Sequence, residues 1–235
     1  MNTVLFDLDG TLLPMEQEAF VQRYISLLSA KTAACGVEPK TMVKALWLGT
    51  EVMIKNDGAA SNRQRFWDCF AAELGQGIRA LEPMINDFYS QEFDAARDAT
   101  KPNPLARQVV DILVAKGYTL ALATNPLFPS VAIDTRLKWV GLNRADFAYI
   151  SDYENSCYCK PHPEYFHAVL KELGKRPAEA LMVGNSPSED MAAKNLGLEV
   201  YLITDFIEGE GDHTLFPHGS FAEFASYVEQ MEEAR

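Results

Sequence analysis

Residues 4–13 read VLFDLDGTLL, a short apolar strand that ends in two aspartates, a glycine and a threonine. Positions i and i+2 of a strand lie on the same face, so the carboxylates of Asp7 and Asp9 repel each other there. A buried strand gains nothing from such a pair. The stretch therefore predicts that a cationic group lies between these two side chains.

Other short apolar runs that end in small or polar residues are found at 118–124, 147–151, 181–184 and 200–204. Between and after these runs, helical periodicity predicts helices at 104–116, 129–140, 163–173, 187–196 and 220–234. Strands that alternate with helices over short connections are typical of an open, parallel α/β sheet. We therefore expect an α/β fold.

The block from residue 15 to residue 101 interrupts this alternation, because its periodicity is helical throughout. It predicts helices at 16–34, 40–55, 62–74 and 81–97. We expect residues 1–14 and 102–235 to form the sheet domain and residues 15–101 to form an inserted helical domain. The tract Lys101-Pro102-Asn103-Pro104 is expected to be a stiff hinge at its exit.

Composition excludes several classes of function. The chain has 235 residues, 48% of them apolar, and a formal net charge of -12, so a nucleic acid polymer or an anionic membrane surface would repel it. No run approaches the length of a membrane span, and the N-terminus does not resemble a secretory signal. Four cysteines are too few for a disulfide scaffold, which favours a reducing compartment, the cytoplasm. The spacing in Cys157-Tyr158-Cys159 is tighter than that of structural zinc sites.

Ligands of an open parallel sheet gather at the carboxyl ends of its strands. The chemically active side chains expected at that edge are Asp7, Asp9, Thr124, Asn125, Lys160, Asn185 and Asp190. Carboxylate and amide oxygens suit a small hard cation such as Mg²⁺, while a lysine and a threonine suit phosphoryl oxygens. The set predicts a phosphate site with a metal.

Four motifs in this order, each beside a predicted strand, resemble those of the haloacid dehalogenase-like hydrolase superfamily. They are Asp7-Leu8-Asp9-Gly10-Thr11, Thr124-Asn125, Lys160-Pro161 and Gly184-Asn185-Ser186 with Asp190. The helical block after the first motif resembles the superfamily's type 1 cap. The resemblance implies a Rossmann-like core and a phosphatase of the cytoplasm.

The resemblance also implies roles for these residues. Asp7 would attack phosphorus and form an aspartyl-phosphate, and Asp9 would protonate the leaving oxygen and then activate water. Thr124, Asn125 and Lys160 would hold the transferring phosphoryl group. Asp7, Asp9, Asn185 and Asp190 would supply the ligands of Mg²⁺.

Asp9 and Asn185 bear on the choice between a phosphatase, a dehalogenase and an inactive relative. Asp9 favours a phosphatase over a dehalogenase, because cleavage of a carbon–halogen bond needs no proton for the leaving group. Asn185 stands where the family usually has an aspartate, which predicts weaker metal binding and leaves open a weakly active or inactive relative that binds a phosphorylated ligand or a protein. Glu189 belongs to a predicted capping box, which predicts a role in helix capping and not in the site. The expected substrate is a small phosphorylated metabolite of undetermined identity, and the sequence does not indicate an oligomeric state.

Overall fold

The structure is a computed structural model, and it describes residues 1–234. Six strands form one parallel sheet in the order β3-β2-β1-β4-β5-β6. Their bounds are Thr3–Phe6 (β1), Thr119–Leu122 (β2), Tyr149–Ile150 (β3), Ala180–Gly184 (β4), Glu199–Ile203 (β5) and His218–Gly219 (β6). The central strand β1 pairs with both β2 and β4, so that Phe6 lies opposite Leu122 and Val183. The predicted α/β fold is confirmed.

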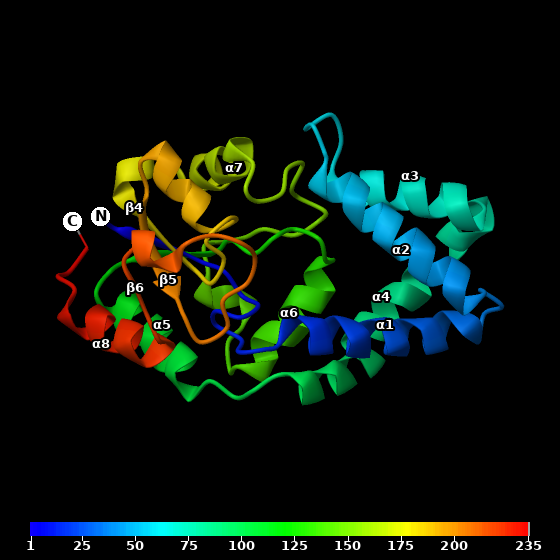
Figure 1. The fold of residues 1–235 in the computed structure, drawn as a ribbon, viewed down its shortest axis with the longest axis horizontal. Helices are drawn as coiled ribbons and strands as arrows, with labels where there is room; N and C mark the ends of the chain where they lie inside the picture. The colour runs from blue at the N-terminus through cyan, green and yellow to red at the C-terminus, as the bar shows by residue number, and fades with distance from the viewer. Residues whose placement is uncertain (235) are drawn as a thin grey trace.

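Helices cover both faces of the sheet (Figure 1). Because side chains alternate along a strand, Val4 and Phe6 point to one face and Leu5 to the other. The first face packs on helices α5 (Pro104–Ala115) and α8 (Phe221–Gln230), and the second face packs on α7 (Pro163–Leu173). Burial on both faces explains why the strands are apolar along their whole length.

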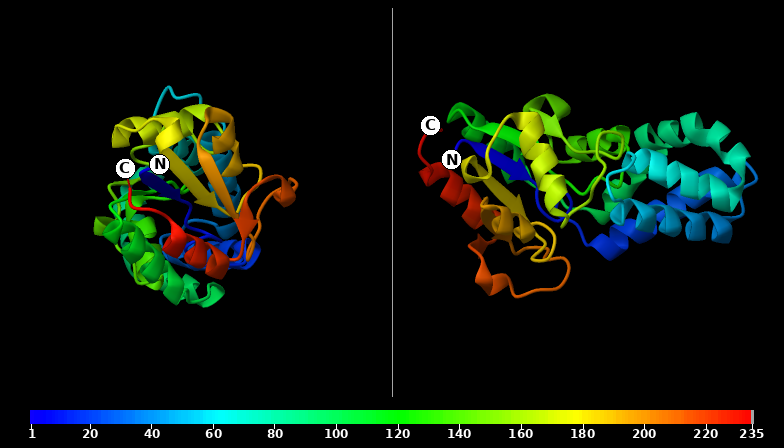
Figure 2. Two further views of the ribbon diagram at one scale, coloured as in Figure 1. Left: turned by 90° about the vertical axis from the view of Figure 1, so that its left-hand side faces the viewer. Right: turned by 90° about the horizontal axis from the view of Figure 1, so that it is seen from above.

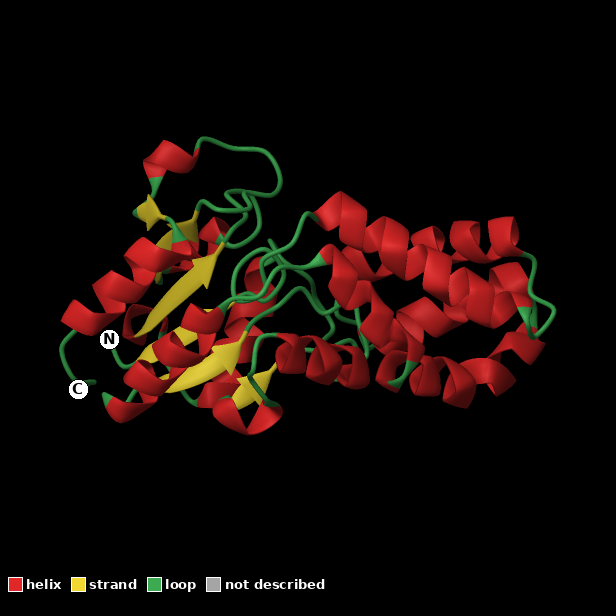
Figure 3. Ribbon diagram, turned by 90° about the horizontal axis from the view of Figure 1, so that it is seen from below, coloured by secondary structure: helices red, strands yellow, loops and turns green. Residues whose placement is uncertain are grey.

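The segment between β1 and α5 is helical and projects from one end of the sheet (Figures 2 and 3). It contains α1 (Gln17–Ala33), α2 (Pro39–Ile54), α3 (Asn62–Leu74), α4 (Glu82–Ser90) and the 3-10 helices Gln76–Leu81 and Glu92–Ala99. The chain enters and leaves this helical module side by side, because Met15 and Thr100 form an antiparallel bridge and Lys101 N donates to Pro14 O at 2.8 Å. The module contacts the sheet domain through helix α6 (Ser130–Trp139).

The remaining elements are short 3-10 helices at Arg144–Asp146, Pro177–Glu179, Met191–Leu196 and His213–Leu215. In place of the helix predicted at 187–196, the structure has only the 3-10 helix Met191–Leu196. The helix predicted at 81–97 is broken at Gln91, whose φ is -125° and ψ is -86°. The break lets Phe88 and Phe93 both reach the buried aromatic cluster, with their ring centroids 6.0 Å apart. Strand β6 was not predicted. Within residues 1–234, none of the helices combines the length and apolarity that a bilayer crossing requires.

Candidate active site

The carboxyl ends of the strands face the helical module, and a cavity of about 330 Å³ lies between them. We call it the strand-end cavity. Parallel pairing brings the ends of β1, β2 and β4 level, since Asp7 N donates to Val183 O at 2.9 Å and Ala123 N donates to Phe6 O at 2.7 Å. All seven side chains predicted for the site line this cavity, namely Asp7, Asp9, Thr124, Asn125, Lys160, Asn185 and Asp190.

Lys160 joins two of these carboxylates. Its Nζ donates to Asp7 Oδ1 and to Asp190 Oδ1, each at 2.7 Å, and its side chain is 2% exposed. Burial alone lowers the pKa of Lys160, but the carboxylates of Asp190 and Asp7 outweigh it and raise that pKa well above its usual range. The ammonium group is thus charged. The sequence predicted a cation between Asp7 and Asp9, whereas Lys160 lies between Asp7 and Asp190, and Asp9 pairs with a different cation, Arg136.

Asp190 is held on its other side by the backbone. Its Oδ2 accepts from the N–H groups of Asn185 and Ser186, both at 3.0 Å. The Asp190 carboxyl lies so close to the backbone of residue 184 that only glycine fits there, because a Cβ would lie 2.2 Å from that carboxyl. Both oxygens of Asp190 are therefore engaged, one by Lys160 and the other by the turn after β4.

Asn185 is linked to Asp7 through a hydroxyl. Thr11 Oγ1 lies 3.3 Å from Asp7 Oδ2 and 3.2 Å from Asn185 Oδ1, while Asn185 Nδ2 donates to Phe206 O at 2.6 Å. Gly10 has a φ of +76°, and a Cβ there would lie 2.1 Å from Asn185 Nδ2. The turn after β1 thus needs glycine both for its backbone angle and for the contact with Asn185.

Asp9 has a partner that the sequence did not reveal. Its Oδ2 forms an ion pair with Arg136, which is 1% exposed and lies with its guanidinium 4.3 Å from the centroid of the Phe128 ring. The other oxygen, Oδ1, is buried and has no hydrogen-bond partner among the described residues. Burial raises the pKa of Asp9, and Arg136 opposes that rise. The carboxyl is therefore suited to hold and release a proton at Oδ1.

Asn125 connects the second motif to the third and fourth. Its Oδ1 accepts from Lys160 N at 3.2 Å, and its Nδ2 donates to Glu189 Oε2 at 3.0 Å. Thr124 is buried, and its carbonyl accepts from the hydroxyls of Ser151 and Tyr165. Glu189 lines the cavity, and burial raises its pKa. Its carboxylate thus belongs to the site, which the capping assignment had missed.

Glu208 is the fifth carboxylate at the cavity and was also missed, because it comes from a polar loop after β5. Burial and the charge of Asp7 raise its pKa to about 7. Against five carboxylates, Lys160 is the one basic side chain among the described residues that line the cavity. A local excess of negative charge of this size favours cation binding.

The donor set fits Mg²⁺ in its chemistry. Within residues 1–234, no three His, Cys, Asp or Glu side chains are grouped so as to hold a metal. The nearest arrangement is mixed: Asp7 Oδ2 and Asn185 Oδ1 meet at the Thr11 hydroxyl, and Asp9 Oδ1 is an unpartnered buried oxygen in the same cavity. Hard oxygen atoms of this kind are the ligands that Mg²⁺ takes in proteins.

Two curated proteins are similar to this chain over most of its length. A phosphoglycolate phosphatase from Mesorhizobium japonicum is 26% identical over 201 residues, which cover 85% of this chain and 81% of that protein. The pyrophosphatase PpaX of Bacillus velezensis is 25% identical, with 89% of this chain and 86% of that protein covered.

Solved structures share the fold. A HAD phosphatase from Thermococcus onnurineus superposes with a TM-score of 0.62 at 21% identity, covering 99% of this chain and 100% of that one. A 2-haloacid dehalogenase from Pseudomonas syringae pv. tomato has the same TM-score at 20% identity, covering 98% and 99%. The family model of the haloacid dehalogenase-like hydrolases matches residues 1–197. The chain belongs to the haloacid dehalogenase-like hydrolases, as its four motifs indicated.

Proposed function

We propose that this hydrolase is a Mg²⁺-dependent phosphatase that cleaves a small phosphate monoester through an aspartyl-phosphate on Asp7. The observation that carries the proposal is the pairing of Asp7 with Lys160 in a cavity that also holds the second carboxyl, Asp9. The names of the similar phosphoglycolate phosphatase and pyrophosphatase support the same reaction class. We further propose that residues 15–101 act as a cap over a core made of residues 1–14 and 102–235.

The proposed reaction has two steps. In the first, Asp7 forms a bond to phosphorus, the bond from phosphorus to the leaving oxygen breaks, and Asp9 gives its proton to that oxygen. In the second, water attacks phosphorus while Asp9 takes up the water's proton, and the bond to Asp7 breaks to release phosphate. The raised pKa of Asp9 and its unpartnered Oδ1 support this proton transfer.

Other residues bind and orient. Lys160 holds the Asp7 carboxylate in place, and Thr124 and Asn125 are expected to hydrogen-bond the phosphoryl oxygens. Oxygens of Asp7 and Asn185 would hold Mg²⁺, with Asp190 adding negative charge around the ion and Asp9 adding it once its proton has been given up. When bound, the ion would neutralise phosphoryl charge. All four cysteines are free thiols, which supports the expected location in a reducing cytoplasm.

The test is release of inorganic phosphate from a generic aryl phosphate with and without Mg²⁺. Asp7→Asn is expected to lower kcat by three or more powers of ten, because it removes the nucleophile. Asp98→Asn, the same change at an exposed carboxylate of the helical module, is the control. Near-normal turnover by Asp7→Asn excludes the aspartyl-phosphate. Absence of Mg²⁺-dependent release from every ester tested favours the inactive relative that Asn185 suggests.

A further inference from the structure

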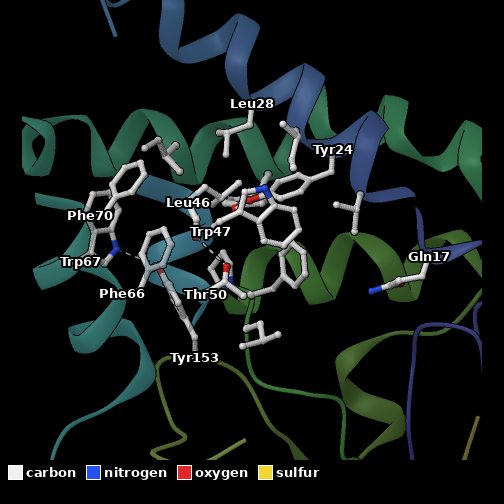
Figure 4. Close-up of a pocket in the computed structure, with 17 residues that line it drawn as sticks. Gln17, Tyr24, Leu28, Leu46, Trp47, Thr50, Phe66, Trp67, Phe70 and Tyr153 are labelled. Atoms are coloured by element: carbon white, nitrogen blue, oxygen red, sulfur yellow. Dashed lines mark hydrogen bonds between the residues drawn. The ribbon is translucent and has the colours of Figure 1, made fainter. Parts of the chain in front are cut away.

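A second cavity, of about 130 Å³, adjoins the strand-end cavity and lies between the helical module and residues 127–129 and Tyr153 of the sheet domain (Figure 4). We call it the apolar cavity. Aromatic side chains from several elements surround it, among them Trp47 of α2, Phe66 and Trp67 of α3 and Phe128 before α6. Phe66 stacks on Phe70 with ring centroids 5.0 Å apart. Eight of the 17 residues that line the cavity are aromatic, and most of the others are aliphatic.

The two cavities adjoin, because six residues line both of them. The residues that line both are Gln17, Val21, Trp47, Thr50, Leu127 and Phe128. Trp47 is 50% exposed, which is unusual for so large an apolar side chain, and it lies at this junction. A phosphate ester with its phosphorus near Asp7 would therefore direct its leaving group past Trp47 and Phe128 into the apolar cavity.

The apolar cavity offers little to a charged or polyhydroxylated group. Of the described residues that line it, none carries a charge. Its hydroxyls and indole are largely committed to each other, since Tyr24 and Tyr89 share a hydrogen bond of 2.7 Å and Trp67 Nε1 donates to Tyr153 OH at 3.4 Å. Burying a carboxylate here would cost its hydration without supplying a cation.

The basic residues beside the loop 57–61 do not supply a cation to the apolar cavity. Lys55 and Arg63 flank residues 57–61 and point to acidic neighbours instead, forming ion pairs with Glu51 and Glu82. Neither lines the cavity. Among the described residues that line the apolar cavity, the one buried side-chain oxygen or nitrogen without a hydrogen-bond partner is Gln17 Oε1, at the junction of the two cavities. A hydroxyl or amide near the phosphoryl group could reach it, but a distant carboxylate could not use it.

The volume of the apolar cavity limits the size of the leaving group that it can bind. A dry cavity of about 150 Å³ lined by Leu, Ile and Phe binds benzene. At about 130 Å³, the apolar cavity has room for one aromatic ring or a short branched chain. Edge-to-face and stacked contacts with the lining rings favour the aromatic group.

We propose that the substrate is a phosphate monoester whose leaving group is neutral and apolar, of the size of one aromatic ring. This inference rests on the proposed phosphatase activity. It distinguishes this chain from relatives named for phosphoglycolate, whose leaving group is a small anion. The apolar cavity binds the ring, and the strand-end cavity binds the phosphoryl group.

The first test compares kcat/KM for benzyl phosphate and 2-phosphoglycolate under the same Mg²⁺ concentration. Both are esters of unactivated alcohols, so the ratio reports leaving-group recognition rather than leaving-group reactivity. Benzyl phosphate is expected to be preferred by about tenfold to a hundredfold, as burial of a ring predicts. A ratio of one or less overturns the inference while leaving the phosphatase activity intact.

A variant places a charge in the cavity. Phe66→Arg, at a half-buried position that lines only the apolar cavity, is expected to lower the preference for benzyl phosphate at least tenfold and to improve 2-phosphoglycolate relative to it. Val114→Arg adds the same charge at an exposed site on α5 and is expected to keep the wild-type ratio. An unchanged ratio in a folded Phe66→Arg protein contradicts the assignment.

Binding of the leaving group alone keeps the inference testable without catalysis. Trp47 and Trp67 line the cavity, so benzyl alcohol is expected to change the tryptophan fluorescence saturably, whereas glycolate is not. Saturable binding of benzyl alcohol by a protein without phosphatase activity would overturn the proposed function but not the apolar subsite. Absence of such binding, together with active hydrolysis of phosphate esters, overturns the subsite alone.

Discussion

Asn185 illustrates how one side chain serves both the fold and the site. Its amide Nδ2 donates to Phe206 O, and its Oδ1 lies beside the hydroxyl of Thr11, which also contacts Asp7. An aspartate in this position could not donate to the carbonyl. The amide therefore holds the loop after β5 against the turn after β1, while its oxygen still faces the proposed metal site.

Replacing Asn185 by Asp is expected to have two opposite effects. The added charge lowers the Mg²⁺ concentration for half-maximal activity several-fold, because a carboxylate binds a hard cation more strongly than an amide. Without Mg²⁺, the free energy of unfolding falls by about 1–3 kcal/mol, since Phe206 O loses its donor and faces an anion. A Mg²⁺ titration of phosphate release and urea unfolding in EDTA measure the two effects. Asn195→Asp, at an exposed position, is the control, and an unchanged Mg²⁺ midpoint contradicts the weaker-metal hypothesis.

The residues of the site were predictable to different degrees. Asp7 and Asn185 directly follow strands, so their position at the carboxyl edge follows from the strand pattern alone. Arg136 was not predictable, because it lies within a helix and reaches Asp9 only through the tertiary packing of α6. Glu189 and Glu208 were missed for a similar reason, since their burial depends on loops whose course the local sequence does not determine.

At the scale of elements, helix α6 links the helical module to the site. It carries Arg136, it packs against α4 and the 3-10 helix Glu92–Ala99, and it follows Phe128, which lines both cavities. Its first residue, Ser130, donates its backbone N–H to Glu154 Oε2 at 3.0 Å. A carboxylate at a helix N-terminus satisfies a free N–H group and interacts favourably with the helix dipole.

The surroundings of Glu154 also make stability depend on pH, because burial and Asp152 outweigh the bond from Ser130, which lowers the pKa of this carboxyl. Burial and the neighbouring Asp152 raise the pKa of Glu154 from 4.5 to about 7. The folded protein then binds this proton more tightly than the unfolded chain, so stability decreases as pH rises between about 4.5 and 7. Glu154→Gln keeps an acceptor but does not titrate.

We expect the melting temperature of Glu154→Gln to exceed that of the wild type at pH 8 and the difference to vanish or reverse at pH 5. The shift is a few degrees at most, because the side chain is partly exposed and solvent screens the repulsion. Thermal unfolding at both pH values measures it, with Glu172→Gln at an exposed site of α7 as the control. An equal difference at pH 5 and pH 8 would show that Glu154 does not titrate in this range.

Elements were predictable where the local pattern is long and uniform. Helices α3 and α7 have the predicted bounds, since Ser61 accepts from Gln64 N at the start of the first and Gly174 ends the second. The break at Gln91 could not be predicted, because the apolar periodicity continues through it and only the packing of Phe88 and Phe93 reveals it. Strand β6 has two residues, too few to produce a pattern.

At the scale of the molecule, the two parts meet around the site. The helical module lies at the carboxyl edge of the sheet, and both termini lie at the opposite end (Figure 1). The two connecting segments run side by side at Met15 and Thr100. The two connections thus form a single narrow junction between the helical module and the sheet domain. A few contacts suffice to fix the position of the module relative to the sheet domain, and both cavities lie between these two parts.

The charge of the whole molecule makes its stability sensitive to Mg²⁺. The chain has a net charge of -12, and five carboxylates surround Lys160 at the strand-end cavity. When the free Mg²⁺ concentration is a hundred times the dissociation constant of this site, binding raises the free energy of unfolding by about 2.7 kcal/mol. For a chain of this size, that corresponds to an increase in melting temperature of about 5–10 °C. We therefore expect Mg²⁺ to raise the melting temperature above that in EDTA with NaCl at equal ionic strength, and Asp7→Asn to reduce the increase. Scanning calorimetry measures both. Equal melting temperatures in Mg²⁺ and in matched NaCl would mean that screening of surface charge, and not a bound ion, accounts for any salt effect.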